Sequence, residues 1–135
     1  MRRRKALWLT AGAAALAALA LVQGGAAGPG SLGAFFFGPK LVRAEVIMQD
    51  GGTTHDYRID RGIVRAVAPG SVTLLERDGT TVTVPVLASA DIRLGGRTVR
   101  LARLRLLTAR GVALVATTIR DGDRPAQAIQ AERSA

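Results

Sequence analysis

The sequence predicts an all-β domain preceded by an N-terminal hydrophobic helix, and three observations support this prediction. Residues 6–39 carry no charge and follow the basic start Met1-Arg2-Arg3-Arg4-Lys5. From Leu41 onward, apolar and polar residues alternate with the period of two that is typical of a strand. Turn signals rich in glycine recur about every ten residues, which predicts six to seven short strands.

Segment 1–27 is predicted to be a secretory signal peptide or a single N-terminal membrane anchor. Its apolar part, residues 6–22, would span roughly 25 Å as a helix, slightly less than a hydrocarbon core. Small residues stand at the two positions that a signal peptidase reads before a cut after Ala27. Both alternatives bring this segment to the membrane, transiently if it is cleaved, and leave the rest of the chain outside the cytoplasm. We therefore expect an extracytoplasmic protein that is either membrane-anchored or secreted.

Residues 28–40 are predicted to be a linker rich in glycine, proline and phenylalanine. The triplet Phe35-Phe36-Phe37 contains every phenylalanine of the protein. Three roles are open for it: packing against the domain or its edge, anchoring beside the bilayer where aromatic rings are stable, or forming part of an unpacked tether.

Composition limits the remaining chain to one folded unit, predicted over residues 41–132 with a tail at 133–135. The chain has 135 residues and a formal net charge of +9, but four of its 19 lysines and arginines belong to the basic start. The residues that follow segment 1–27 can bury enough surface for one hydrophobic core, but not for two domains. The complete lack of cysteine excludes disulfides and thiolate metal sites.

The first predicted hairpin joins a strand at 41–49 to a strand at 55–68. Asp50-Gly51-Gly52-Thr53 between them is typical of a tight turn, since glycine supplies the positive φ that a reversal needs. Gly62 interrupts the second strand and predicts a bulge or sharp bend. Turn chemistry at residues 68–71 then ends that strand.

The clearest hairpin is predicted around Asp78-Gly79, between β-branched strands at 71–77 and 80–87. Pro85 cannot donate a backbone hydrogen bond, so its position predicts an unpaired edge or a bulge. A short strand at 92–94 follows and ends at Gly95-Gly96. Residues 99–107 fit either a helical turn or a strand.

The last two strands are predicted at 112–118 and 125–132. A turn at Asp121-Gly122 separates them, and Ile129 is expected to point inward. The short strands, the glycine bend and the single helical turn before the final hairpin together predict a closed or nearly closed barrel of the oligonucleotide-binding (OB) type.

Three runs of residues, at 60–67, 70–74 and 78–84, resemble an uncharacterised family of exported bacterial domains that is frequent in actinobacteria. The resemblance extends over roughly residues 44–131. It implies a small OB-like β-barrel and a location in the cell envelope. Because the family has no established activity, the resemblance supplies no catalytic residues.

The sequence predicts no enzyme, cofactor or metal site. His55 is the only histidine, and its neighbour Asp56 would point to the opposite face of a strand. The spacings of a nucleophile elbow, a Walker motif and a zinc protease are all missing. Asp121-Gly122-Asp123 is interpreted as a solvated turn, since no glutamate follows to complete a calcium loop.

The remaining candidate is a stretch of arginines without an intervening acidic residue, which would create a positive potential. The candidate polyanion-binding residues are Arg93, Arg97, Arg100, Arg103, Arg105 and Arg110. We expect a non-enzymatic envelope module that meets anionic lipid, wall polymer or an acidic protein. Nucleic acid is the less favoured partner, because Tyr57 is the sole aromatic residue after Phe37 and base stacking needs several. The third interpretation is an ordinary solvated surface.

Overall fold

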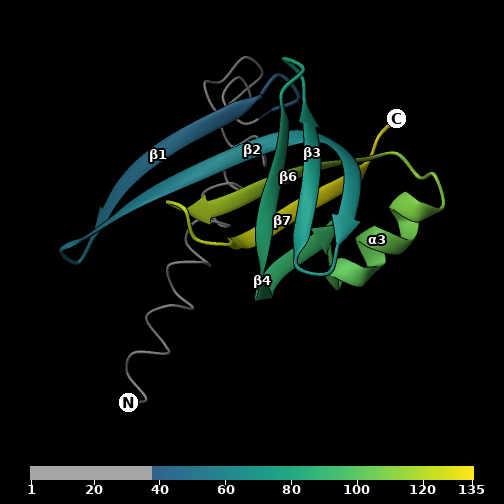
Figure 1. The fold of residues 1–135 in the computed structure, drawn as a ribbon. Helices are drawn as coiled ribbons and strands as arrows, with labels where there is room; N and C mark the ends of the chain where they lie inside the picture. The colour runs from purple at the N-terminus through teal and green to yellow at the C-terminus, as the bar shows by residue number, and fades with distance from the viewer. Residues whose placement is uncertain (1–37) are drawn as a thin grey trace. The chain divides into compact units, whose positions relative to one another are not determined.

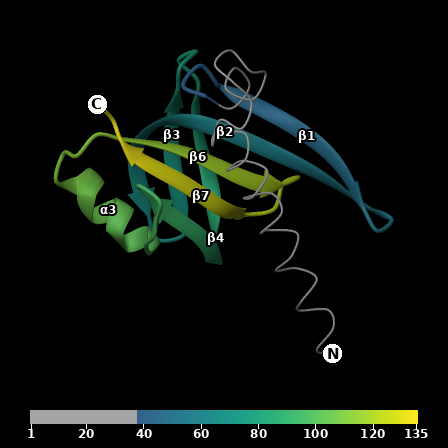
Figure 2. The same ribbon diagram turned by 180° about the vertical axis from the view of Figure 1, so that it is seen from behind.

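The computed structural model describes residues 38–135 (Figures 1 and 2). The predicted signal or anchor at 1–27, and the linker up to Phe37, lie outside the described residues. Within residues 38–135, no helix is long and apolar enough to cross a membrane. One compact unit extends from Val42 to Ala135. Its elements are β1 (Arg43–Asp50), β2 (Thr53–Ala68), β3 (Ser71–Glu76), β4 (Thr81–Leu94), β5 (Arg97–Thr98), α3 (Leu101–Ala109), β6 (Leu114–Asp121) and β7 (Ala126–Arg133).

The long strand β2 organises the sheet, because three other strands pair with it. Along one edge it pairs first with β1 and then with β3. Its other edge pairs with β6. The predicted β1–β2 hairpin is confirmed, and Gly51 and Gly52 both take positive φ at its turn. Figure 1 shows β2 curving from β1 at one end to β3 at the other.

Gly62 lies where the backbone of β3 passes close to β2. A Cβ atom at this position would come within 2.5 Å of the backbone oxygen of Leu75, so no larger residue fits without a shift of the backbone. The predicted irregularity is present, but the register shift against β3 lies between Val64 and Ala66 rather than at Gly62. Glycine is therefore required here by the neighbouring backbone.

The β3–β4 hairpin forms around Asp78-Gly79 as predicted, with Leu74 opposite Val82. The prediction of two separate strands at 80–87 and 92–94 is wrong, because β4 continues through both. Pro85 is the last residue that pairs with β3, and the pairing of β4 with β7 is irregular between Val86 and Asp91. Residues 88–91 remain extended while the strand changes partners, which side-chain periodicity does not reveal.

The helical interpretation of residues 99–107 is correct, since Leu101–Ala109 forms α3. The predicted β content is confirmed: the described chain holds one seven-stranded sheet and this helix. Strands β6 and β7 are antiparallel, whereas β4 and β7 are parallel. Because β2 pairs with both β3 and β6, the pairing order β2–β3–β4–β7–β6 returns to β2.

One apolar core lies inside this circuit of strands. Leu74 and Ile129 are fully buried, as the inward position predicted for Ile129 requires. Leu104 and Leu107 of α3 belong to the same cluster, so the helix packs onto the core. The other members are Val64, Val72, Val84, Val86, Ile92, Leu114, Ala116, Ala126 and Ala131.

Candidate functional site

The six arginines predicted from the sequence lie on the β4–β5 hairpin and on or beside α3, and we call them the arginine surface. They are Arg93, Arg97, Arg100, Arg103, Arg105 and Arg110. Every one of them is exposed. The β4–β5 pairing brings Arg93 opposite Thr98 and Arg97 opposite Leu94, so two of the arginines share a short hairpin. The other four follow one after another along the helix segment.

Packing of α3 decides where its arginines point. Leu104 and Leu107 are buried and stand three residues apart, so they form the stripe that faces the core. Arg103 and Arg105 are two positions apart, which rotates them by about 200° around the helix axis. They therefore flank the outer face from opposite sides. Leu106, which is 41% exposed, lies between them.

Almost no acidic residue neutralises the arginine surface. Its one ion pair within residues 38–135 joins Arg93 Nη2 to Asp91 Oδ2 at 3.5 Å. The first turn of α3 contains no acidic residue, and Arg100 at its N-cap makes no side-chain capping bond. Since a helix N-terminus carries a partial positive charge, Arg100 and Arg103 add to a field of the same sign.

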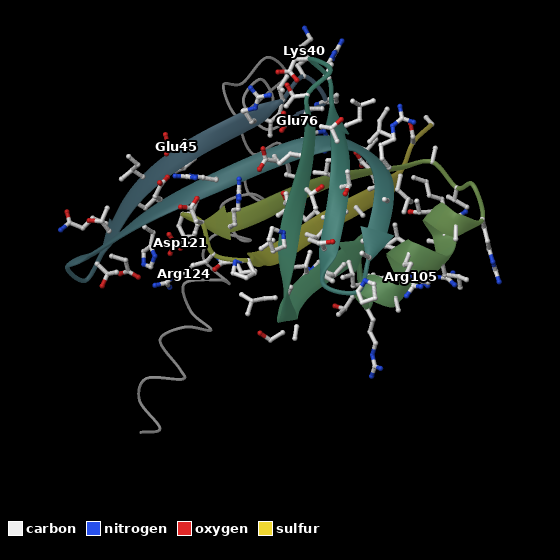
Figure 3. All side chains as sticks on the ribbon, in the orientation of Figure 1. Lys40, Glu45, Glu76, Arg105, Asp121 and Arg124 are labelled. Carbon is white, nitrogen blue, oxygen red and sulfur yellow. The ribbon has the colours of Figure 1, made fainter. Side chains whose placement is uncertain are left out.

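Arginines of β1 and β2 that are held by carboxylates include Arg43 and Arg58, whereas Arg65 on β2 is exposed and forms no ion pair within residues 38–135. Arg43 on β1 reaches across β2 and binds Glu76 through Nε at 3.1 Å and Asp78 at 2.6 Å. Arg58 donates from Nη1 to Asp123 at 2.8 Å. Figure 3 shows Glu76 and Arg105 in separate parts of the unit. The arginine surface therefore differs in pairing from Arg43 and Arg58.

Two buried acidic residues, Asp60 and Glu76, lie next to each other beside Arg43. The side chains of Asp60 and Glu76 are 10% and 1% exposed. Burial raises the pKa of Glu76 and outweighs the opposing hydrogen bond from Arg43, and the neighbouring carboxyl group of Asp60 raises this pKa further. Arg120 Nη2 lies 3.9 Å from Asp60 Oδ2. Cationic side chains thus border the pair, which suits a structural role in the sheet.

His55 has an acidic partner that sequence reasoning missed. Its Nδ1 lies 2.8 Å from Asp121 Oδ2, and its ring stacks on Tyr57 with centroids 5.4 Å apart. The other oxygen of Asp121 accepts the backbone N–H of Asp56 at 3.1 Å. Although burial acts in the opposite direction, these two hydrogen bonds hold the pKa of Asp121 below its ordinary value. His55 is therefore a half-buried side chain beside the β1–β2 turn, and its acidic partner is Asp121 rather than the neighbouring Asp56.

The His55–Asp121 pair is a contact between two strands that are distant in the sequence. No hydroxyl group hydrogen-bonds the ring of His55 within the described part of the chain. The pair joins residues 66 positions apart, so only the pairing of β2 with β6 reveals it. Asp121 binds the imidazole of His55, and Asp123 accepts a hydrogen bond from Arg58.

The aromatic requirement for nucleic-acid binding is also poorly met. Tyr57 is only 6% exposed and stacks on His55, so its ring is not open to a base. Comparisons of the chain with models of protein families, with curated proteins and with solved structures find no match. The functional argument therefore depends on the geometry of the chain itself.

Proposed function

We propose that this chain is a non-enzymatic OB-like β-barrel module of the bacterial cell envelope, located outside the cytoplasm, that binds an anionic partner. The observation that carries the proposal is the arginine surface, where six exposed arginines form one ion pair within the described chain, between Arg93 and Asp91. The resemblance of residues 44–131 to exported bacterial domains belongs to the same proposal. The extracytoplasmic location rests on the basic start and the uncharged residues 6–39.

The pairing of the strands supports the OB-like part of the proposal. An OB fold is a five-stranded, partly open Greek-key barrel. Here the five-strand circuit β2–β3–β4–β7–β6 returns to β2, with one parallel pair between β4 and β7. The helix α3 lies between β4 and β6 in sequence and packs on the enclosed core. Strand β1 is an addition to this circuit, since it pairs only with β2.

An anionic partner is favoured because five of the six arginines form no ion pair within residues 38–135, and Arg93 forms one at 3.5 Å. The carboxylate in an ion pair offsets the positive potential of its arginine, whereas an unpaired arginine attracts a polyanion with its full charge. The outer face of α3 combines Arg103 and Arg105 with the exposed Leu106. A cationic face with an exposed apolar residue suits anionic lipid headgroups, and wall polymer or an acidic protein would meet the same charges.

A charge-reversal experiment tests the proposal. The full chain would be held in neutral phosphatidylcholine nanodiscs on a sensor, and phosphatidylglycerol vesicles, poly(glycerol phosphate) and single-stranded DNA would be passed over it. Arg105→Glu removes two charge units from the arginine surface. At about 1 kcal/mol per charge near an anionic membrane, we expect vesicle affinity to fall roughly 30-fold.

The matched control is Arg77→Glu. Arg77 is also exposed and forms no ion pair with any residue of the described range, but it lies in the β3–β4 turn. This control should change vesicle affinity less than about threefold at physiological salt. Tight, steeply salt-dependent DNA binding without vesicle affinity would favour the nucleic-acid alternative. If none of the three polyanions binds, the arginine surface is an ordinary solvated surface.

A further inference from the structure

Strand β1 has one free edge in the described part of the chain. It pairs with β2 over all eight of its residues, Arg43 to Asp50, and with no other strand. Natural edge strands are commonly protected by proline, lysine or a bulge. Strand β1 contains neither residue type, and its register with β2 is regular throughout.

The hydrogen-bonding groups of this edge follow from one backbone contact. Arg61 donates its N–H to the carbonyl of Val42 at 3.0 Å. In an antiparallel ladder the residues alternate, so the even-numbered residues of β1 turn their N–H and C=O groups toward β2. The odd-numbered residues Glu45, Ile47 and Gln49 therefore turn theirs toward the free edge.

The same stretch exposes large apolar side chains. Ile47 is 69% exposed and Met48 is 45% exposed, the two highest values among the large hydrophobic residues in the described range. They lie on β1 opposite Asp56 and His55, beyond the last pair that β2 makes with β6 at Tyr57. The exposed apolar groups and the free backbone edge therefore coincide.

The sequence around Ile47 is self-complementary for antiparallel pairing. If Ile47 faces the same residue of a second copy, Val46 faces Met48, and Glu45 faces Gln49, whose amide can donate to the carboxylate. No two like charges come opposite each other. In each facing pair, the two residues are both odd-numbered or both even-numbered. The outward N–H and C=O groups of the odd-numbered residues therefore face each other and can hydrogen-bond. A two-fold axis at Ile47 thus satisfies the backbone and the side chains together.

We propose that β1 is a dimerisation strand, and that two copies of this chain pair antiparallel through β1 with Ile47 at the two-fold axis. This two-fold arrangement is closed, because the same surface serves both copies. The seven-stranded sheet of each copy then continues into that of the other. The interface lies on β1, whereas the arginine surface lies on β4, β5 and α3, so the dimer does not depend on the proposed anionic partner.

Single cysteines test this arrangement cleanly, because the native chain has none. The full chain in neutral detergent would carry Ile47→Cys and be treated with a short bis-maleimide. Opposed residues in such a pair are about 5.5 Å apart between Cα atoms, so we expect efficient cross-linking to a dimer. With Glu45→Cys alone, the two cysteines would be separated by about 14 Å along the strands. That variant should cross-link poorly, whereas a mixture of Glu45→Cys and Gln49→Cys chains should cross-link well.

Two controls separate pairing through β1 from association through the N-terminal segment. Ser89→Cys places an exposed thiol on β4, and it should stay uncross-linked at the same concentration. Ile47→Lys would bring two cations together at the axis, so sedimentation equilibrium should show at least a tenfold weaker dimer. Equal cross-linking of Ile47→Cys, Glu45→Cys and Ser89→Cys chains, or a monomeric wild-type chain at 100 μM, would overturn the proposal.

Discussion

Two groups of arginines in this unit differ in their ion pairing. On β1 and β2, Arg43, Arg58 and Arg61 are each bound to at least one carboxylate, at 2.6–3.1 Å. On or beside β4, β5 and α3, the six members of the arginine surface form one ion pair with any residue from 38 to 135, that of Arg93 with Asp91 at 3.5 Å. The residue type is the same in both regions, so composition does not distinguish them. The paired arginines donate hydrogen bonds to carboxylates that are 33 to 71 positions away in the sequence, whereas the arginine surface lies in a stretch with no acidic residue between Asp91 and Asp121.

This comparison separates stability from binding. In the paired region, which we define by Arg43, Arg58 and Arg61, the charge of each arginine stabilises contacts between strands. Its loss should therefore change the free energy of unfolding. On the arginine surface, the charge faces solvent, and its loss should be measured as a change in affinity for a polyanion. Variants in the two regions are therefore expected to affect different measurements.

The largest stability effect is expected at Gly62, within the paired region. Gly62→Ala places a methyl group 2.5 Å from the Leu75 oxygen, so β2 and β3 must separate. Overpacking of this kind costs about 3 kcal/mol, which urea unfolding followed by circular dichroism would detect. Ser89→Thr adds a methyl group at an exposed position of β4 and should change stability by less than about 0.5 kcal/mol. Equal stability of the two variants would contradict the close approach of the strands.

An intermediate effect on stability is expected for Arg61→Met in the paired region, and Arg105→Met on the arginine surface is its matched control. Arg61 donates to Thr117 Oγ1 at 3.0 Å and to Glu132 at 2.7 Å, and its side chain is only 13% exposed. Arg61→Met should therefore cost about 1–2 kcal/mol of unfolding free energy and leave vesicle binding unchanged. Arg105→Met should do the reverse, with stability within about 0.5 kcal/mol of wild type. A loss of vesicle affinity in both variants would remove the distinction between the regions.

The smallest effect is expected at Asp121, and it depends on pH. Because the folded-state pKa of this carboxyl group is lowered, its charged form stabilises the fold above about pH 4, and this contribution disappears as the pH falls below that value. Asp121→Asn should therefore lose about 1 kcal/mol at pH 7 and less at pH 3. Urea unfolding at both pH values measures the difference. A loss that is independent of pH would show that the amide fails to pack rather than that a charge is missing.

Much of the fold was predictable because turn residues and strand periodicity act locally. Asp78-Gly79 marked its hairpin correctly, and Leu104 in a helical spacing identified α3 as one of two alternatives. The continuous strand β4 was missed, because a change of pairing partner between Val86 and Asp91 leaves no signal in the alternation. The sequence also identified the arginine surface, because its members are close in the chain.

Contacts between distant residues could not be predicted in this way. Arg43 and Glu76 are 33 positions apart, and His55 and Asp121 are 66 apart. Each pair forms only after strands have acquired their neighbours, so no local spacing indicates it. An alternation pattern predicts which face a residue takes, but not which residue it meets there.

The circuit of strands also has a kinetic consequence. Pairing of Tyr57 with Asp121 joins the two ends of a long loop of chain, and closing such a loop costs entropy before any contact repays it. The β3–β4 hairpin closes only a short loop and should form early, whereas β6 reaches β2 late. Folding is therefore expected on the slow time scale of non-local topologies, on the order of milliseconds to seconds, and until closure the growing sheet presents two open edges to other nascent chains.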